Sequence, residues 1–300
     1  MEKLNPGEYG FLLLTSNLGN PDRKPLSVAR MRELFDRSDR IKRRDPAGNV
    51  SVYDFTSIGY SHKFAQHIID LLCDEELLQY YLHKSRKADC VPITRATESY
   101  PILVRKRLGL DSPGVLWAKG DMSILKNPTV SLVGSRDLNP ANEKFAAEVG
   151  RQAAIQGYTL VSGNARGADK TAQRACLAAG GSVVCVVADS LKEHKTRSNV
   201  LYLSESSFDE PFSAQRALSR NRVIHALGLM TFVAQASLHS GGTWDGTVKN
   251  LRNGWSPVYG FEDGSDAMLE LGQMGLERID LDALSDFYNL PQLEENIIDR

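Results

Sequence analysis

The sequence is poor in the residues that build covalent or metal-held frameworks. It has only four cysteines, and none lies in a CxxC or a paired His/Cys spacing. A disulfide framework and a zinc site are therefore not expected. We expect the cysteines to be reduced, buried thiols. No apolar stretch approaches the ~20 residues that a membrane-spanning helix needs, and the run Phe11–Leu14 is too short for the core of a signal peptide. We expect a cytoplasmic protein that does not contact a membrane.

The chain as a whole has no large excess of positive or negative charge, but its two parts differ. The net charge is −1, yet residues 261–300 carry −9 and the first 260 residues carry +8. A basic body with an acidic end can bind a polyanion through a local patch. The alternative is an ordinary solvated surface with an uneven end.

The first ninety residues have the pattern of helices. Ser27 and Ser61 are suitable N-caps for helices over 28–35 and from 62 to 72, and a third apolar face follows at 77–82. We assign residues 1–92 to a small helical N-terminal domain. Its basic run Arg37–Arg44 is expected to be a solvated loop or a nucleic-acid contact.

The pattern changes after residue 92, where short apolar runs alternate with helical stretches. This alternation indicates βαβ units, and hence an α/β domain over 93–275 whose parallel sheet is covered on both faces. Residues 276–300 remain as an acidic C-terminal tail. Its apolar residues could pack on the sheet domain, or the tail could cover a basic groove. The expected strands are 130–133, 158–161, 182–187, 200–203, 230–234 and 257–260, and the expected helices are 140–156, 168–179, 213–227 and 243–252.

The most informative segment runs from Ser162 to Thr171. A buried strand enters a loop with two glycines, Gly163 and Gly167, and a helix begins directly afterwards. This arrangement directs backbone N–H groups and a positive helix end toward a phosphate. Arg166 and Lys170 extend along one side of that helix, and Asp169 lies in its first turn. A tight turn with an exposed basic face is the alternative. Neither a Walker A motif nor a GxGxxG fingerprint is present.

Two further polar or basic loops lie at strand ends of the predicted sheet, and a basic triplet lies on the predicted helix just before another strand. In a parallel sheet the carboxyl ends of the strands share one edge, where ligands bind. Together the four segments predict an anion-binding rim. The added segments are Gly134-Ser135-Arg136, Arg220-Asn221-Arg222 and Ser240-Gly241-Gly242-Thr243.

These four motifs occur in the order and spacing of the DNA-processing protein A (DprA/Smf) family, which the chain resembles over about residues 98–260. The resemblance implies an extended Rossmann-like domain that binds single-stranded DNA, protects it and loads a RecA-type recombinase. It also implies a homodimer. Carried over, Arg136 contacts a phosphate, Ser162, Gly163 and Gly167 offer backbone donors, and the triplet 220–222 closes the pocket.

The chain departs from the family pattern at several positions. Ala217 stands where the family often has an aromatic residue, so base stacking depends on Phe212 or another ring. Gln173 replaces a usual histidine, and Asp189 brings negative charge to the sheet edge. These departures are compatible with a divergent member used in defence against foreign DNA.

No catalytic constellation, metal site or cofactor motif is visible, which favours binding over catalysis. One alternative comes from another class, the "lonely guy" phosphoribohydrolases of the Rossmann-like superfamily. The segment Gly241-Gly242-Thr243 partly resembles their loop, and Asp245 is the nearby acid. A nucleotide sensor or a hydrolase is therefore the second hypothesis.

Overall fold

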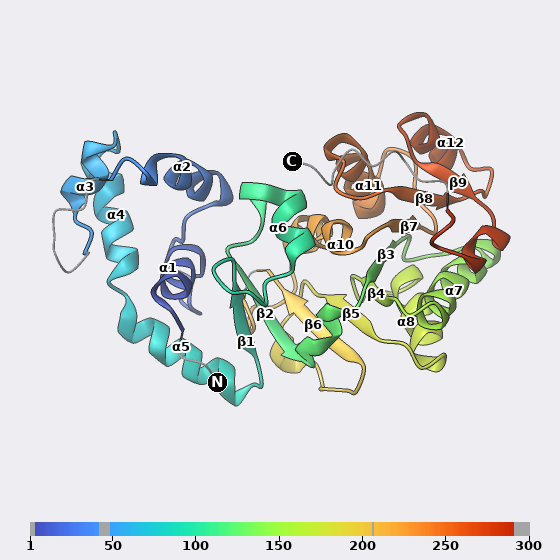
Figure 1. Cartoon of the computed structure of the whole chain (residues 1–300), viewed down its shortest axis with the longest axis horizontal. Coiled ribbons are helices and arrows are strands. Elements are labelled where there is room, and N and C mark those ends of the chain that lie inside the picture. Colours follow the sequence, from blue (N-terminus) through green and yellow to red (C-terminus); the bar gives the residue numbers. More distant parts are fainter. Residues whose placement is uncertain (1–3, 42–48, 206, 291–300) are drawn as a thin grey trace.

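The fold is built on one nine-stranded sheet with helices on both faces (Figure 1). It is seen in a computed structural model that describes residues 4–41, 49–205 and 207–290. The strand order is β1-β2-β6-β5-β4-β3-β7-β8-β9. The chain runs outward from β3 in one direction through β4, β5 and β6, and in the other through β7, β8 and β9.

Seven of the strands, from β6 across to β9, are parallel. Only β1 and β2 break the pattern, since β1 pairs antiparallel with β2 and β2 pairs antiparallel with β6. The predicted α/β class with a mostly parallel sheet is confirmed. The strands are β1 Val91–Thr94, β2 Val115–Gly120, β3 Thr129–Val133, β4 Thr159–Ser162, β5 Val183–Val186, β6 Val200–Ser204, β7 Thr231–Val233, β8 Val258–Phe261 and β9 Glu277–Ile279.

Two apolar clusters fill the space on the two faces of this sheet. One face packs against α7 Pro140–Ile155 and α8 Ala168–Ala178 through Phe145 and Val149. The other is covered by helices whose apolar sides form a separate cluster. These helices are α6 Ile102–Leu108, α9 Ala214–Ser219, α10 Asn221–Leu227, α11 Gly241–Asn253 and α12 Asp266–Gln273, with α9 at the margin.

The N-terminal helices lie at the β1 end of the sheet (Figure 1). They are α1 Pro6–Thr15, α2 Val28–Ser38, α3 Val52–Ser57, α4 His62–Leu72 and α5 Glu75–Lys87. The predicted caps are confirmed, because Ser27 accepts the N–H of Arg30 and Ser61 accepts that of Phe64. The first four of these helices, α1 to α4, share a third apolar cluster. Since Leu12 and Tyr81 belong instead to the α7–α8 side of the main core, this region is joined to the sheet by packing.

Three strands were not among those predicted. β1 contains a proline and β2 is antiparallel, so neither shows a βαβ signature. β9 buries only one of its three residues, so it leaves no apolar run in the sequence. β9 lies inside the expected acidic tail and pairs with β8 of the sheet. Residues 277–290 of that segment therefore contribute to the fold, whereas 291–300 lie outside the described residues, as do 42–44 of the basic run.

Within the described ranges, no helix combines the length and apolar character needed to cross a bilayer. The same ranges contain no group of three or more His, Cys, Asp or Glu side chains placed to hold a metal ion.

The segment after β9 packs on the end of α7. Leu284 and Phe287 are buried, and the Phe287 ring lies 4.9 Å from that of Phe232 and 5.6 Å from that of Tyr158. The side-chain amide of Gln156 donates to the Leu284 carbonyl at 2.9 Å and accepts the Phe287 N–H at 2.7 Å. Of the apolar residues expected to pack on the sheet domain, Leu284, Phe287 and Leu290 are buried and Tyr288 is exposed. They lie in or after a short 3-10 turn, Asp282–Ser285, and not on a long helix.

This packing predicts that Phe287→Ala lowers the free energy of unfolding by roughly 3–5 kcal/mol, because it removes a buried ring and leaves a cavity. The neighbouring Tyr288 is 76% exposed, so Tyr288→Ala is the matched control, with an effect within about 0.5 kcal/mol. Urea unfolding measures both. Equal effects of the two substitutions would show that the segment is not held against the sheet.

Candidate nucleic-acid interface

Four loops leave the sheet at the carboxyl ends of adjacent parallel strands. Gly134–Arg136 follows β3, Gly163–Gly167 follows β4, Asp189 follows β5, and the segment 234–240 joins β7 to α11. β3 and β7 are neighbours from which the chain continues in opposite directions. This is the topological switch point, where open α/β sheets form a crevice for ligands.

One hollow of about 440 Å³, here called the central hollow, brings three of the predicted motifs together. It lies between the loop after β3, the start of α10 and the start of α11, with Ala165 and Asp169 contributed by the β4–α8 loop. From the predicted residues it is lined by Gly134, Ser135, Arg136, Arg220, Asn221, Ser240, Gly241, Gly242 and Thr243.

The loop after β4 closes onto the loop after β3 because Gly167 has no side chain. Gly167 has φ +79°, and a Cβ there would lie 2.4 Å from the backbone oxygens of Ser135 and Arg136. The next residue, Ala168, donates its N–H to the Ser135 carbonyl at 3.1 Å. Gly167 therefore permits the contact between the two loops, and any side chain at this position would separate them.

A buried charge holds the third motif against the second. Arg220 is 8% exposed and donates to the Gly163 carbonyl at 3.0 Å. A Cβ on Gly163 would lie 2.0 Å from an Arg220 guanidinium nitrogen. The Arg220 side chain also donates to the Asn221 side-chain oxygen at 3.1 Å, while its buried Nε has no partner among the described residues. Gly163 thus provides space for the guanidinium.

Asp169 balances this charge from the start of α8. Its carboxylate accepts the N–H of Ala165 at 3.0 Å and also that of Gly163. Burial raises the pKa of Asp169, although the Arg220 charge and these N–H groups act in the opposite direction. Burial likewise lowers the pKa of Arg220, and Asp169 opposes that change. The N–H of Gly163, expected to be a donor for phosphate, is therefore directed to Asp169.

Arg136 lies where three hollows meet. Besides the central hollow it lines a side hollow of about 320 Å³ with Arg166, Asp189 and Phe212. It also lines an outer hollow with Arg166, Lys170 and Arg174. Arg136 is exposed, and it has no ion-pair partner among the described residues.

The other predicted cations are partly engaged. Arg166 donates to Asp137 at 2.9 Å, but both side chains are largely exposed, so this ion pair is easily exchanged for a ligand. Lys170 donates to Asn164 and, at 3.4 Å, to Gln173. Its charge remains beside the rim while its ammonium group is bound within the loop.

Two predicted residues do not lie on the rim. Ser162 is the last residue of β4 and is fully buried, and its hydroxyl accepts a hydrogen bond from Gln173 at 2.6 Å. Arg222 is separated from Arg220 by two helical positions, so its side chain leaves α10 in a different direction. The expectation that Arg222 closes the pocket is therefore wrong.

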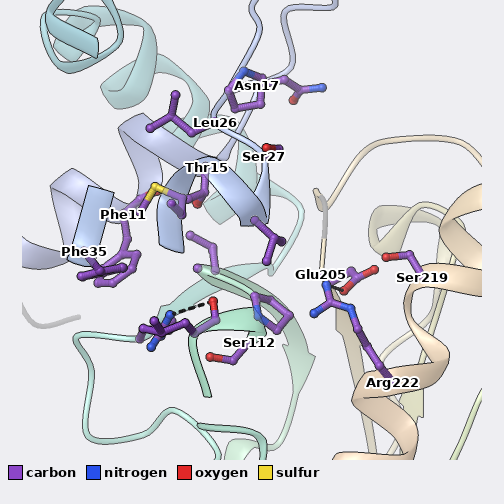
Figure 2. A pocket seen from close by; sticks show the side chains of 18 of the residues that line it. Phe11, Thr15, Asn17, Leu26, Ser27, Phe35, Ser112, Glu205, Ser219 and Arg222 are labelled. Carbon is purple, nitrogen blue, oxygen red and sulfur yellow. Dashed lines mark hydrogen bonds and ion pairs between the residues drawn. The ribbon is translucent and has the colours of Figure 1, made fainter. Parts of the chain in front are cut away.

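Arg222 instead lines a cavity of about 350 Å³ between the N-terminal helices and the sheet. It pairs with Glu205 at 2.7 Å and donates to the Asp111 carbonyl. Figure 2 shows Arg222 and Glu205 on one wall of this cavity, facing α1 and the loop that carries Leu26.

The side hollow contains two residues that the comparison with the family pattern singled out. Asp189 brings a negative charge to the sheet edge, and Phe212 is the ring that could replace the missing aromatic residue at position 217. Phe212 is 57% exposed, although Phe side chains are usually buried. Trp244, which follows the segment Ser240–Thr243, is largely buried and packs edge-on against His239, so it offers no exposed face to a base.

Comparisons with known proteins agree with this fold. The family model of DNA recombination-mediator protein A matches residues 92–249. DNA processing protein DprA of Streptococcus pneumoniae is 32% identical over 145 residues, covering 44% of this chain and 50% of that protein. Protein Smf of Escherichia coli is 30% identical over 142 residues, covering 44% of this chain and 38% of Smf. The chain thus spans about half the length, or less, of these curated relatives.

Two solved structures extend the likeness of fold beyond the matched segment. The X-ray structure of DNA processing protein A from S. pneumoniae superposes with a TM-score of 0.72 at 21% identity, covering 93% of this chain and 95% of that one. DNA processing protein A from Helicobacter pylori, whose structure is described for its single-stranded DNA binding mode, gives 0.54 at 23% identity, covering 64% and 92%. The family is named for mediating recombination and not for an enzymatic activity. With the family model matched over more than half of its length, the chain belongs to the DNA recombination-mediator protein A family.

Proposed function

We propose that the protein binds single-stranded DNA through backbone phosphates along the rim formed by the loops after β3, β4 and β7. The observation that carries this proposal is Arg136, an exposed guanidinium without an ion-pair partner in the described part of the chain, at the junction of three hollows. A DNA strand is longer than any one of these hollows. Because Arg136 lines all three, its guanidinium can contact the strand where it passes from one hollow to the next.

The other charges of the rim also favour binding of phosphate. Arg166 and Arg174 line the outer hollow, and the Arg220 charge lies beneath the central one. The first turn of α11 adds backbone N–H groups, and its N-cap Ser240 makes no side-chain cap hydrogen bond. Unpaired N–H groups at a helix start are suited to a phosphate oxygen. Such contacts provide affinity without sequence preference.

A base surface beside the rim favours a single strand over a duplex. Phe212 lines the side hollow next to Arg136 and is exposed. Stacking on an aromatic ring stabilises a bound single strand by roughly 1–3 kcal/mol per base. The bases of a duplex are already stacked on each other, so they gain nothing from this ring.

The second candidate function is binding of a mononucleotide. The central hollow has the volume of a small-molecule site, about 440 Å³. Hydrolysis of that nucleotide is less well supported, because Asp245 is paired with Lys249 at 2.7 Å and does not line the hollow. Release of base from AMP, CMP or GMP, lost in Asp245→Asn, would decide for the phosphoribohydrolase.

Further steps in the cell follow from the family. Protection of a strand and its transfer to a RecA-type recombinase, in natural transformation or in defence against foreign DNA, are the roles we propose, with the cytoplasm as the compartment. A homodimer would place two rims on one strand and raise the overall affinity. Light scattering of the full chain with and without oligo-dT tests the dimer.

The salt dependence of binding tests the phosphate contacts. We expect the logarithm of the association constant for oligo-dT to fall linearly with the logarithm of salt concentration, with a slope of roughly −0.7 per phosphate neutralised. Fluorescence anisotropy at several salt concentrations measures this slope. A constant independent of salt, or equal affinity for duplex and single strand, would contradict the proposal.

A pair of arginine substitutions tests the location of the site. Arg136→Ala should weaken binding about tenfold for any base sequence, because a charge-assisted hydrogen bond contributes on the order of 1.5 kcal/mol. Its melting temperature should hardly change, since the side chain is exposed.

The matched control is Arg222→Gln, which removes the same charge two residues beyond Arg220 but leaves the Glu205 carboxylate, 8% exposed, without its partner. It should lower the free energy of unfolding by roughly 1–3 kcal/mol and leave DNA affinity nearly unchanged. The reverse pattern, with DNA binding lost in Arg222→Gln and kept in Arg136→Ala, would place the site in the cavity of Figure 2.

A further inference from the structure

The lining of the side hollow combines two kinds of chemistry. It includes three arginines, Arg136, Arg166 and Arg220, and it also includes Phe212, Asn164 and Asp189. A phosphate needs only the arginines. The other residues offer an aromatic face and a carboxylate, which suit a nucleobase.

Asp189 is out of place in a pocket for phosphate alone. Its side chain is 47% exposed, and it follows β5 at the same edge as the arginines. A carboxylate repels phosphate, so its presence reduces the attraction that the three guanidinium groups provide. A ligand that brings hydrogen-bond donors to this carboxylate would compensate for that repulsion.

The carboxylate is also held in place. His194 Nε2 lies 2.9 Å from Asp189 Oδ1, and the His194 ring stacks on Tyr202 with the centroids 4.5 Å apart. The hydrogen bond with His194 lowers the pKa of Asp189, so the group is an acceptor at neutral pH. Each carboxylate oxygen accepts more than one hydrogen bond, and the exposed part of the group is available to a ligand.

Among the four DNA bases, only guanine presents two adjacent donors on its Watson–Crick edge, N1–H and the N2 amino group. In cytosine and adenine the amino group lies beside a ring acceptor, and in thymine N3–H lies between two carbonyl oxygens. Both arrangements place a lone pair against a carboxylate oxygen. A fixed carboxylate therefore selects guanine.

We propose that Asp189 makes the rim selective for guanine. In a bound strand, the base next to the phosphate on Arg136 turns into the side hollow, stacks on Phe212 and donates its N1–H and N2 amino group to Asp189. This inference rests on the proposed single-strand function and adds to it a base preference at one nucleotide, where phosphate contacts alone give none.

The test uses the full chain and a short oligo-dT that carries one central guanine, compared with the same oligonucleotide carrying hypoxanthine, adenine, cytosine or thymine. Hypoxanthine differs from guanine only by the missing N2 amino group. We expect the guanine oligonucleotide to bind roughly 5- to 100-fold more tightly than the thymine one, the range for a bidentate base contact, with hypoxanthine in between.

Two variants with the same change of charge separate base reading from electrostatics. Asp189→Asn should abolish the guanine preference, so that the guanine and thymine oligonucleotides bind equally. Asp137→Asn removes a carboxylate that pairs with Arg166 but does not line the side hollow. It should alter the affinity for all five oligonucleotides by one common factor and keep their order.

The outcomes are distinguishable. If the parent protein binds none of the oligonucleotides, the proposed function fails. If it binds all five equally, or if Asp189→Asn keeps the guanine preference, the function stands and the inference is overturned. A third arm adds dGMP, because the same chemistry would bind a free guanine nucleotide. Binding of dGMP as tight as that of the oligonucleotide would overturn selection within a strand. The comparison of guanine with hypoxanthine needs no variant, so it holds even if Asp189→Asn fails to fold.

Discussion

The rim depends on one buried cation. Arg220 is bound to the Gly163 carbonyl and balanced by Asp169, so the start of α10 and the β4–α8 segment, about fifty residues apart in the sequence, meet around its guanidinium. A charge in this position is costly unless it is paired and hydrogen-bonded. Because Gly163 leaves the space and Asp169 supplies the counter-charge, the arginine holds the start of α10 against the β4–α8 loop. The loop after β3 then closes on the same loop through Gly167.

This arrangement separates the charges that build the rim from those that remain available. Arg220, Asp169 and Lys170 make internal contacts, whereas Arg136 and Arg166 are exposed. The first group gives the loops a defined shape and the second offers cations to a ligand without reorganising the loops. Asp189 adds a negative group at one edge, held by His194. In the function and base preference that we propose, affinity comes from the arginines and selectivity from Asp189.

Much of this architecture could be predicted from the sequence, because buried parallel strands and amphipathic helices leave clear periodic patterns. The βαβ units from β3 to β8 follow that rule. The antiparallel β2 and the three-residue β9 do not. β2 pairs with β6, far away in the sequence, and β9 buries only one of its three residues, so it leaves no apolar run. Three of the four motifs were recognisable as loops at strand ends, and the triplet 220–222 as part of a helix. The direction of each side chain could not be predicted, because the triplet lies at the start of α10. There, consecutive residues point about 100° apart, which sends Arg222 toward Glu205 and the N-terminal helices. The burial of Ser162 could not be foreseen either, since it depends on the contact with Gln173.

The most direct measurement is a structure of the protein bound to a short oligo-dT. The account predicts a strand that crosses the carboxyl ends of β4, β3 and β7, with a backbone phosphate hydrogen-bonded to the Arg136 guanidinium and Arg220 still bound to Gly163. A strand that lies in the cavity beside Arg222, or along the basic N-terminal segment with the rim empty, would contradict it.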